Sequence, residues 1–154
     1  MKLSINQTAP DFNLPDQNGE MHSLKKYHGQ YVLLYFYPKD DTPGCTKEAC
    51  SFRDNFAELK KAGVVILGAS ADSVKSHAKF AEKFHLNFPL LADEDKKLVN
   101  DYGVYGKKKF MGREYDGIMR TSFLIGKNGK IIKIYEGVKP EKHVAEILED
   151  LAKI

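Results

Sequence analysis

The sequence predicts a three-layer α/β domain, in which helices cover both faces of a central sheet. Two runs of apolar and aromatic residues, Tyr31 to Phe36 and Val64 to Leu67, lack polar alternation and are typical of strands buried on both faces. Helical patterns alternate with these strands, and a hairpin and a last helix follow, as expected of such a domain. The length of 154 residues corresponds to one domain, and we expect residues 1–154 to form it.

The first half of the chain alternates turns, strands and helices. The turn cluster 15–19 lies between two short apolar segments and predicts a hairpin. The first buried strand leads into a loop over 38–44, which holds two prolines and a glycine. A helical pattern then covers 45–61 and ends before Gly63. After the second buried strand, Asp72 is a favourable N-cap for a helix that extends to Phe84.

The second half repeats these signals more weakly. We expect a short strand over 90–92, a short helix over 96–102 and a polar, basic loop over 103–117. Strands over 118–125 and 131–135 flank Asn128-Gly129, a strong hairpin signal. The last helix is predicted to begin at Pro140. His77 is expected to be a structural histidine, His143 a surface residue, and the basic cluster 107–113 a solvated loop.

The composition excludes several classes of protein. The formal net charge of +3 is too small for a dedicated nucleic-acid-binding protein. No apolar run approaches the ~20 residues that cross a bilayer, and residues 1–10 lack the apolar segment of a signal peptide. Two cysteines cannot hold a fold together as in small secreted domains. We therefore expect a cytoplasmic protein that binds neither nucleic acid nor membrane, with cysteines that serve chemistry or bind metal.

The most informative segment, PKDDTPGCTKEAC, runs from Pro38 to Cys50. Its Cys45 lies where a loop leaving a buried strand enters a helix, and the sites of α/β folds gather at that end of the strands. A thiol of pKa about 8.5 is only ~3% ionised at neutral pH, and lowering this value to about 6 requires ~3.4 kcal/mol. A helix N-terminus contributes about 1 to 2 kcal/mol, so we expect a nearby cation as well.

Two arginines are candidates for this cation. Arg53 follows two turns later on the predicted helix, and Arg120 lies inside the apolar segment 118–125. A buried arginine needs a partner, which favours Arg120. A surface position at the edge of the sheet is the alternative for Arg120.

The two cysteines point to different sides of the predicted helix. Cys45 belongs to an apolar stripe that consists of Cys45, Ala49, Phe52, Phe56 and Leu59. At ~100° per residue, Cys50 falls about 140° away, and the two Cα atoms are roughly 8.6 Å apart. A disulfide rarely spans more than ~7 Å between Cα atoms without backbone movement. Pairing of Cys45 with Cys50 therefore requires the first turns of the helix to unwind or slide.

Other interpretations of the cysteines stay open at this point. Either could be a small core residue, Cys50 more readily than Cys45. The Cys-x4-Cys spacing is compatible with zinc, with His22 and His28 as further ligands, but side chains about 140° apart on a helix do not face one ion. A phosphatase would need Cys-x5-Arg, and Ser51 stands at the arginine position.

The chain resembles the peroxiredoxins, whose active-site pattern Pro-x-x-x-Thr-x-x-Cys is matched by Pro38, Thr42 and Cys45. The whole stretch to Cys50 is similar to the Q type, or bacterioferritin-comigratory-protein group. Further matching segments are Ala9 to Phe12, Phe52 to Asp54, Leu67 to Ser73, Phe88 to Leu91, Tyr102 to Val104 and Arg120 to Phe123. The resemblance implies a thioredoxin-like fold with a central mixed sheet, helices on both faces and an added N-terminal hairpin.

The resemblance also implies a thiol peroxidase with no metal, haem or flavin cofactor. Its substrates would be hydrogen peroxide and organic hydroperoxides. Cys45 would attack the peroxide and become a sulfenic acid, and Cys50 would resolve this acid as an intramolecular disulfide. Thioredoxin or a similar dithiol would then reduce the disulfide. Because no further cysteine lies near the C-terminus, we expect a monomer.

Four more residues receive roles from the resemblance. Thr42 would hydrogen-bond the thiolate and the peroxide, and Pro38 would shield the thiolate from water. Arg120 would hold the thiolate and polarise the peroxide, in agreement with the charge argument. Glu48 would orient an arginine.

Two rival functions use the same cysteine. A disulfide oxidoreductase would reduce protein partners without a peroxide step, but Cys45 on the buried stripe suits a small peroxide better than a bulky disulfide. A redox-sensing or chaperone-like binding module would use Cys45 as a switch and would react slowly with peroxide.

Overall fold

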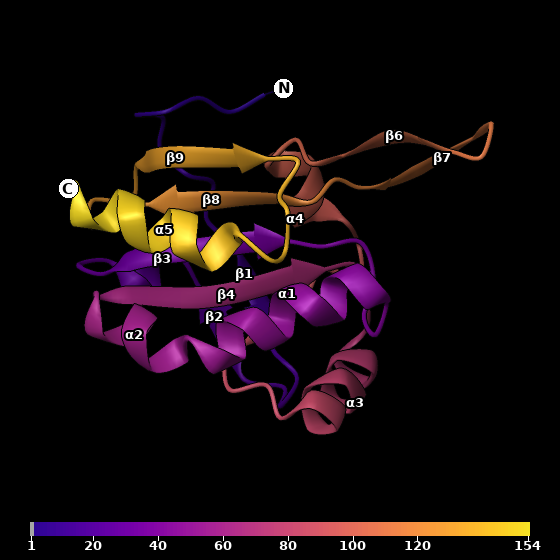
Figure 1. The fold of residues 1–154 in the computed structure, drawn as a ribbon. Coiled ribbons are helices and arrows are strands. Elements are labelled where there is room, and N and C mark those ends of the chain that lie inside the picture. Colours follow the sequence, from indigo (N-terminus) through magenta and orange to yellow (C-terminus); the bar gives the residue numbers. More distant parts are fainter. Residues whose placement is uncertain (1) are drawn as a thin grey trace.

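A five-stranded mixed sheet lies at the centre of the computed structural model, which describes residues 2–154 of the chain (Figure 1). Its strand order is β5-β4-β3-β8-β9. The strands are β3 (Tyr31–Phe36), β4 (Val64–Ser70), β5 (Leu90–Ala92), β8 (Thr121–Ile125) and β9 (Ile131–Glu136). β3, β4 and β5 run parallel, whereas β8 is antiparallel to β3 and β9 is antiparallel to β8. The buried strands predicted from the two apolar runs are confirmed.

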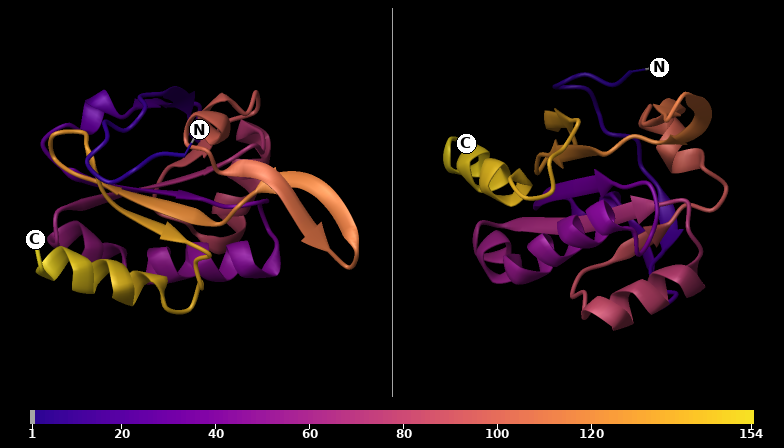
Figure 2. Two further views of the ribbon diagram at one scale, coloured as in Figure 1. Left: turned by 90° about the horizontal axis from the view of Figure 1, so that it is seen from above. Right: turned by 45° about the vertical axis from the view of Figure 1, so that its right-hand side comes forward.

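Helices and the N-terminal segment cover the two faces of this sheet (Figures 1 and 2). One face packs against α1 (Pro43–Asp54), α2 (Phe56–Lys61), α3 (Val74–Phe84) and α5 (His143–Ala152). The other face packs against α4 (Lys97–Asp101), the 3-10 helix η1 (Lys25–Tyr27) and the segment that holds the hairpin of β1 (Asn13–Pro15) and β2 (Met21–Ser23). The predicted thioredoxin-like fold, with its N-terminal hairpin, is confirmed.

The long helix predicted over 45–61 is two helices. α1 ends at Asp54, and α2 begins at Phe56. Asn55 separates them, and its side-chain amide donates at 2.8 Å to the Ser51 carbonyl, which also accepts from the Asn55 backbone amide at 3.1 Å, so the side chain shares the acceptor of a helical hydrogen bond. The break leaves Phe56 only partly buried, although it belongs to the predicted stripe.

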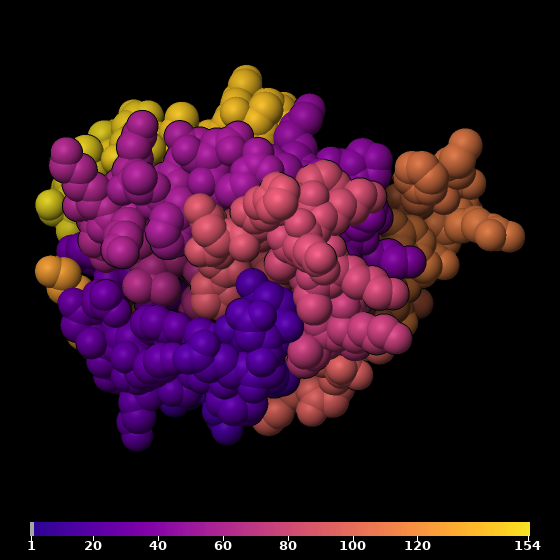
Figure 3. Space-filling model, turned by 90° about the horizontal axis from the view of Figure 1, so that it is seen from below, coloured from indigo at the N-terminus to yellow at the C-terminus, as the bar shows by residue number. Residues whose placement is uncertain are grey.

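The predicted loop over 103–117 was wrong, because this segment forms a β-hairpin. Strand β6 (Tyr105–Phe110) pairs with β7 (Arg113–Ile118), and Met111 and Gly112 make the turn with φ of +52° and +78°. The hairpin projects from the body of the protein (Figures 1 and 3). Neither of its faces is covered along most of its length, so its sequence lacks the apolar alternation that reveals a strand.

Two helix starts also differ from the prediction. α3 is capped by Ser73, whose hydroxyl accepts from the Ser76 amide at 3.1 Å, and not by Asp72. α5 begins at His143, three residues after the predicted Pro140. His143 is fully buried rather than exposed, because its Nε2 lies 2.7 Å from the Ser122 hydroxyl in β8.

Candidate active site

Cys45 lies in the first turn of α1, at the end of the sheet where β3 finishes. β3 ends at Phe36, and residues 37–42 lead into the helix, with Thr42 at the N-cap. The cysteine side chain points into the core and is only 2% exposed. Pro43, at the first helical position, has no amide hydrogen to lose there and fixes the start of α1.

The register of the sheet brings Arg120 to the same place. β8 runs antiparallel to β3, and Phe36 pairs with Thr121, so Arg120 lies beside the start of the loop that carries Cys45. The strand predicted over 118–125 is interrupted at Met119 and Arg120, which frees Arg120 from the ladder. Its Nη2 donates to Cys45 Sγ at 3.3 Å.

Gly44 allows this approach. A Cβ atom at position 44 would lie 3.1 Å from Arg120 Nη2, closer than nearly all such contacts in proteins. Gly44 was not among the site residues predicted from the sequence. Its place directly before Cys45, at the predicted start of a helix, was the available signal.

Glu48 completes an ion pair with Arg120. It lies one turn after Cys45, is fully buried, and its Oε1 accepts from Arg120 Nη1 at 2.7 Å. Burial raises the pKa of Glu48 to about 7, although Arg120 acts in the opposite direction. Burial by itself would lower the pKa of Arg120, but the charges of Glu48 and Cys45 outweigh this effect and raise it.

Thr42 and Pro38 line the loop beside the cysteine. The Thr42 hydroxyl donates its hydrogen to the Lys39 carbonyl at 2.9 Å and not to Cys45. Its oxygen keeps free lone pairs, which can accept a hydrogen bond from a peroxide O–H. Pro38 is partly buried at the start of the loop and has no amide hydrogen.

Cys50 lies five residues after Cys45 on the same helix and is partly buried. Both cysteines are free thiols. The helix is continuous between them, so the geometry that opposes a disulfide in an intact helix applies here.

Arg53, the alternative cation, is engaged elsewhere. Its Nη2 lies 2.8 Å from Asp54 Oδ1, and its Nη1 donates to the Phe84 carbonyl at 2.7 Å. The structure therefore brings Arg120, and not Arg53, to Cys45.

A buried polar network fixes the loop between β3 and α1. Asp40 accepts from the Tyr37 hydroxyl at 2.6 Å, and its second oxygen lies 2.7 Å from His77 Nδ1. The other nitrogen of His77 lies 2.8 Å from the Leu91 carbonyl. His77 is thus the structural histidine that the sequence predicted, and it ties the loop to α3 and β5.

Among residues 2–154, two groups of side chains have the composition of a metal site. They are Asp16, Glu20 and His22, and the Asp40 network with Asp72 and His77. Neither group includes a cysteine, and His22 lies 2.7 Å from Asp16 with its second nitrogen 2.6 Å from the Tyr27 hydroxyl. The zinc interpretation of the cysteines receives no support from this arrangement.

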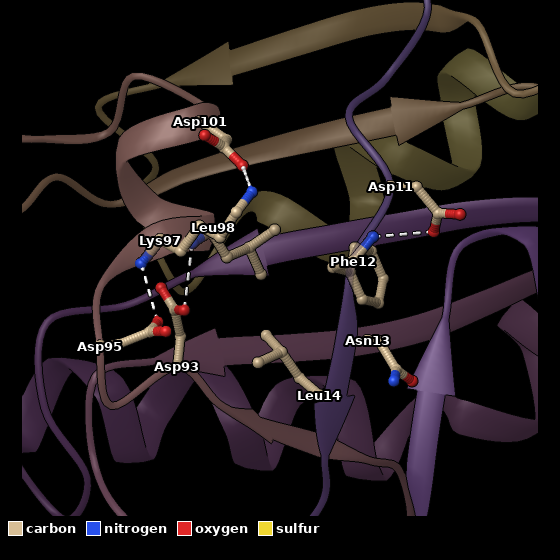
Figure 4. A pocket seen from close by; sticks show the side chains of 9 residues that line it. All are labelled: Asp11, Phe12, Asn13, Leu14, Asp93, Asp95, Lys97, Leu98 and Asp101. Atoms are coloured by element: carbon tan, nitrogen blue, oxygen red, sulfur yellow. Dashed lines mark hydrogen bonds and ion pairs between the residues drawn. The ribbon is translucent and has the colours of Figure 1, made fainter.

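A pocket of about 280 Å³ lies on the opposite face of the sheet, between the N-terminal segment and α4 (Figure 4). Its aspartates are occupied by structural bonds. Asp93 accepts from the amides of Leu98 and Val99 at 3.1 and 2.9 Å, and Asp101 accepts from Lys97 at 2.7 Å. The pocket belongs to the scaffold and not to the chemistry around Cys45.

The fold and this pairing of a buried cysteine with an arginine define a thiol-dependent oxidoreductase of the thioredoxin-like class. The sequence matches the AhpC/TSA family over residues 5–134, and the chain belongs to that family. Within it, the chain is a Q-type peroxiredoxin, and thus a peroxidase, as its similarity to named members shows.

Curated relatives cover nearly the whole chain. Peroxiredoxin Bcp of Escherichia coli is 52% identical over 92% of this chain and 90% of its own length. Peroxiredoxin Bcp of Bacillus subtilis is 48% identical over 98% of this chain and 96% of its own length.

Solved structures agree with this assignment. A cysteine mutant of PrxQ from Xylella fastidiosa has a TM-score of 0.93 at 32% identity and covers 99% of this chain and 98% of its own. The bacterioferritin comigratory protein of Xanthomonas campestris, described with alkyl peroxide reduction activity, has a TM-score of 0.87 at 37% identity and covers 92% and 90%.

None of the helices formed by residues 2–154 is long and apolar enough to span a bilayer.

Proposed function

We propose that the protein reduces hydrogen peroxide and organic hydroperoxides through Cys45, with Cys50 as the resolving thiol. The observation that carries the proposal is the 3.3 Å contact between Arg120 Nη2 and Cys45 Sγ at the first turn of α1. A guanidinium and a helix N-terminus both favour the thiolate, which is the nucleophilic form of cysteine.

In the first step, the Cys45 thiolate attacks one oxygen of the O–O bond. An S–O bond forms, the O–O bond breaks, and its electron pair leaves with the second oxygen, which takes a proton and departs as water or an alcohol. Arg120 stabilises the charge that moves from sulfur to the leaving oxygen, because its guanidinium is already fixed by Glu48. Thr42 accepts from the peroxide, and Pro38 keeps water from the thiolate.

In the second step, the Cys50 thiol attacks the Cys45 sulfenic acid, forms a disulfide and releases water. Both cysteines must leave their helical positions for this, so the step includes local unwinding of α1. Fast resolution protects Cys45 from further, irreversible oxidation. A dithiol such as thioredoxin then reduces the disulfide, which implies a reducing, cytoplasmic setting.

Because both cysteines belong to one chain, the cycle needs no second subunit. We therefore propose that the protein acts as a monomer. Analytical ultracentrifugation of the reduced and the oxidised protein tests this part of the proposal.

The function is tested by counting thiols, because the chain has only two cysteines. One equivalent of peroxide should remove two thiols from the wild type, one from Cys50→Ser and none from Cys45→Ser. In Cys50→Ser the product should react with dimedone, which traps sulfenic acids. Ser51→Ala, a change on the same helix, should behave like the wild type.

Turnover is then measured with peroxide, thioredoxin, thioredoxin reductase and NADPH. Loss of turnover in both cysteine variants supports the cycle. Full turnover in Cys50→Ser would assign resolution to an outside thiol, and continued turnover in Cys45→Ser would overturn the proposal. Activity with dithiothreitol but not with thioredoxin would reject thioredoxin as the reductant and leave the rest of the cycle unchanged.

A further inference from the structure

The β6–β7 hairpin has two chemically different faces. Residues that pair across the strands share a face, and on one face Lys107 pairs with Asp116 and Lys109 with Glu114. The charges of this face balance. On the other face Lys108 pairs with Tyr115 and Phe110 with Arg113, so this face is cationic and aromatic and holds no acidic residue.

Lys108 lies in the middle of this second face, and its side chain reaches back to the base of the hairpin. Its Nζ donates to the Ile118 carbonyl at 3.0 Å, two residues before Arg120. Its side chain lies along Gly117, where a Cβ atom would come within 3.1 Å of Lys108 Cδ. Lys108 is partly buried, whereas its neighbours Lys107 and Lys109 are exposed. The ammonium is thus held in place while the rest of the hairpin projects away.

The charges of Cys45, Arg120 and Glu48 do not cancel. With the Cys45 thiolate present, Arg120 carries one positive charge and faces a negative charge on Cys45 and, above the Glu48 pKa of about 7, a second one on Glu48. The group then has a net charge of −1 in a largely buried place, which is unfavourable without a further cation. Lys108, whose Nζ is held at the Ile118 carbonyl two residues before Arg120, is a cation whose charge would bring the total to zero.

We propose that Lys108 is a positioning residue of the active site, the second cation that stabilises the Cys45 thiolate. It acts through its field on Arg120 and Cys45 and does not touch the sulfur. This proposal rests on the proposed role of Cys45 as the nucleophile. The basic cluster 107–113, predicted from the sequence to be a solvated loop, would thereby have a function.

The pKa of Lys108 is shifted in the directions expected if Lys108 interacts with Arg120 and Cys45. Burial lowers the pKa of Lys108, the like charge of Arg120 lowers it further, and Cys45 raises it. Other groups near the cysteine include Glu48 from its own helix, which shares Arg120 with it, and Tyr35 from β3, whose pKa is raised by burial and also by the charge of Cys45. Burial raises the pKa of Tyr35 well above its ordinary value, so its hydroxyl stays neutral.

The test uses alkylation of Cys45 by iodoacetamide, which reads the thiolate and needs no peroxide. All variants are made in the Cys50→Ser background so that only Cys45 reacts. Lys108→Met should move the pH profile of alkylation to higher pH by about one unit, the effect of removing one partly screened charge. Its rate with hydrogen peroxide at pH 7 should fall roughly three- to tenfold.

Two variants separate charge from structure. Lys108→Arg keeps the charge and should keep the profile, whereas Lys109→Met removes an exposed lysine of the same strand and should match the parent. Because Glu48 is retained in every variant, a difference between two profiles follows from the substituted lysine.

An unchanged profile in Lys108→Met would overturn the proposal. So would equal losses in Lys108→Met and Lys108→Arg, because these indicate a structural role. If Cys45 of the parent protein is alkylated readily but does not react with peroxide, the proposed function is rejected. The effect of Lys108 on the thiolate can still be tested by alkylation in that case.

Discussion

Arg120 Nη2 lies 3.3 Å from Cys45 Sγ, although 75 residues separate the two in the chain. A hydrogen bond to a charged group contributes about 1.5–3 kcal/mol, so Arg120→Met should slow the reaction of Cys45 with hydrogen peroxide by about 10- to 150-fold. Arg120→Lys keeps a charge but cannot bind Cys45 and Glu48 together, so it should recover only part of the rate. Quenched-flow measurement of thiol loss gives these rates.

Arg53→Met is the matched control for this experiment. Arg53 is the alternative cation on α1 itself, but it binds Asp54 and the Phe84 carbonyl. We expect Cys45 in Arg53→Met to react with hydrogen peroxide at a rate close to that of the wild type. A larger loss in Arg53→Met than in Arg120→Met would show that the contact with Arg120 is not the one that activates Cys45.

Local signals in the sequence predicted part of the site well. The apolar run of β3 and the Pro/Gly-rich loop after it place Cys45 at a helix start without knowledge of the rest of the fold. The approach of Arg120 depends on the β3–β8 register, which pairs Phe36 with Thr121. Single-sequence patterns do not determine that register, so only the need of a buried arginine for a partner pointed to Arg120.

The failures of prediction have physical causes as well. The β6–β7 hairpin shows no apolar alternation because neither face is covered along most of its length. The helix is interrupted at Asn55, whose side-chain amide shares the Ser51 carbonyl with its own backbone amide. His143 was expected at the surface because its partner Ser122 comes from β8, 21 residues earlier.

Gly44→Ala separates activity from stability. The new Cβ would lie 3.1 Å from Arg120 Nη2, so the guanidinium that binds Cys45 has to shift by a few tenths of an ångström. Alanine is the better helix former by up to ~1 kcal/mol, so the free energy of unfolding should be unchanged or slightly higher. We expect the rate with peroxide to fall about three- to tenfold, which corresponds to less than ~1.4 kcal/mol.

Rates and urea unfolding are measured on the same Gly44→Ala sample. Lys47→Ala, an exposed change on α1, serves as the control for added alanine. A Gly44→Ala protein with the wild-type rate would show that Arg120 reaches Cys45 without needing the space above Gly44.

Glu48 should make the stability of the protein depend on pH. Its pKa is raised from 4.5 to about 7, so the folded protein binds this proton more tightly than the unfolded chain. The corresponding stability is complete below about pH 4.5 and is lost as the pH rises through 7. Between pH 4.5 and pH 8 the loss from Glu48 should be about 3 kcal/mol.

Urea unfolding of the reduced protein at pH 4.5 and pH 8 measures this loss. Glu48→Gln has the same shape but no titration, so the difference in stability between the wild type and this variant should change by the same amount between the two pH values. A difference that does not vary with pH would mean that Glu48 stays ionised in the folded protein throughout this range.

Oxidation should melt the first turns of α1. Cys45 and Cys50 lie on one continuous helix, where ideal geometry holds their Cα atoms roughly 8.6 Å apart, and a disulfide rarely spans more than ~7 Å. In hydrogen exchange followed by mass spectrometry, peptides covering 43–54 should lose protection once the disulfide has formed. Peptides of α5 should keep theirs, because α5 contains no cysteine.

Cys50→Ser treated with peroxide separates the disulfide from the oxidation of Cys45. This variant stops at the sulfenic acid, which does not require the helix to open, so α1 should keep its protection. Equal loss of protection in the wild type and in Cys50→Ser would assign the opening to the first oxidation step. An oxidised wild type with a Cys45–Cys50 disulfide and full protection of α1 would contradict the geometric argument, because the bond would then exist within an intact helix.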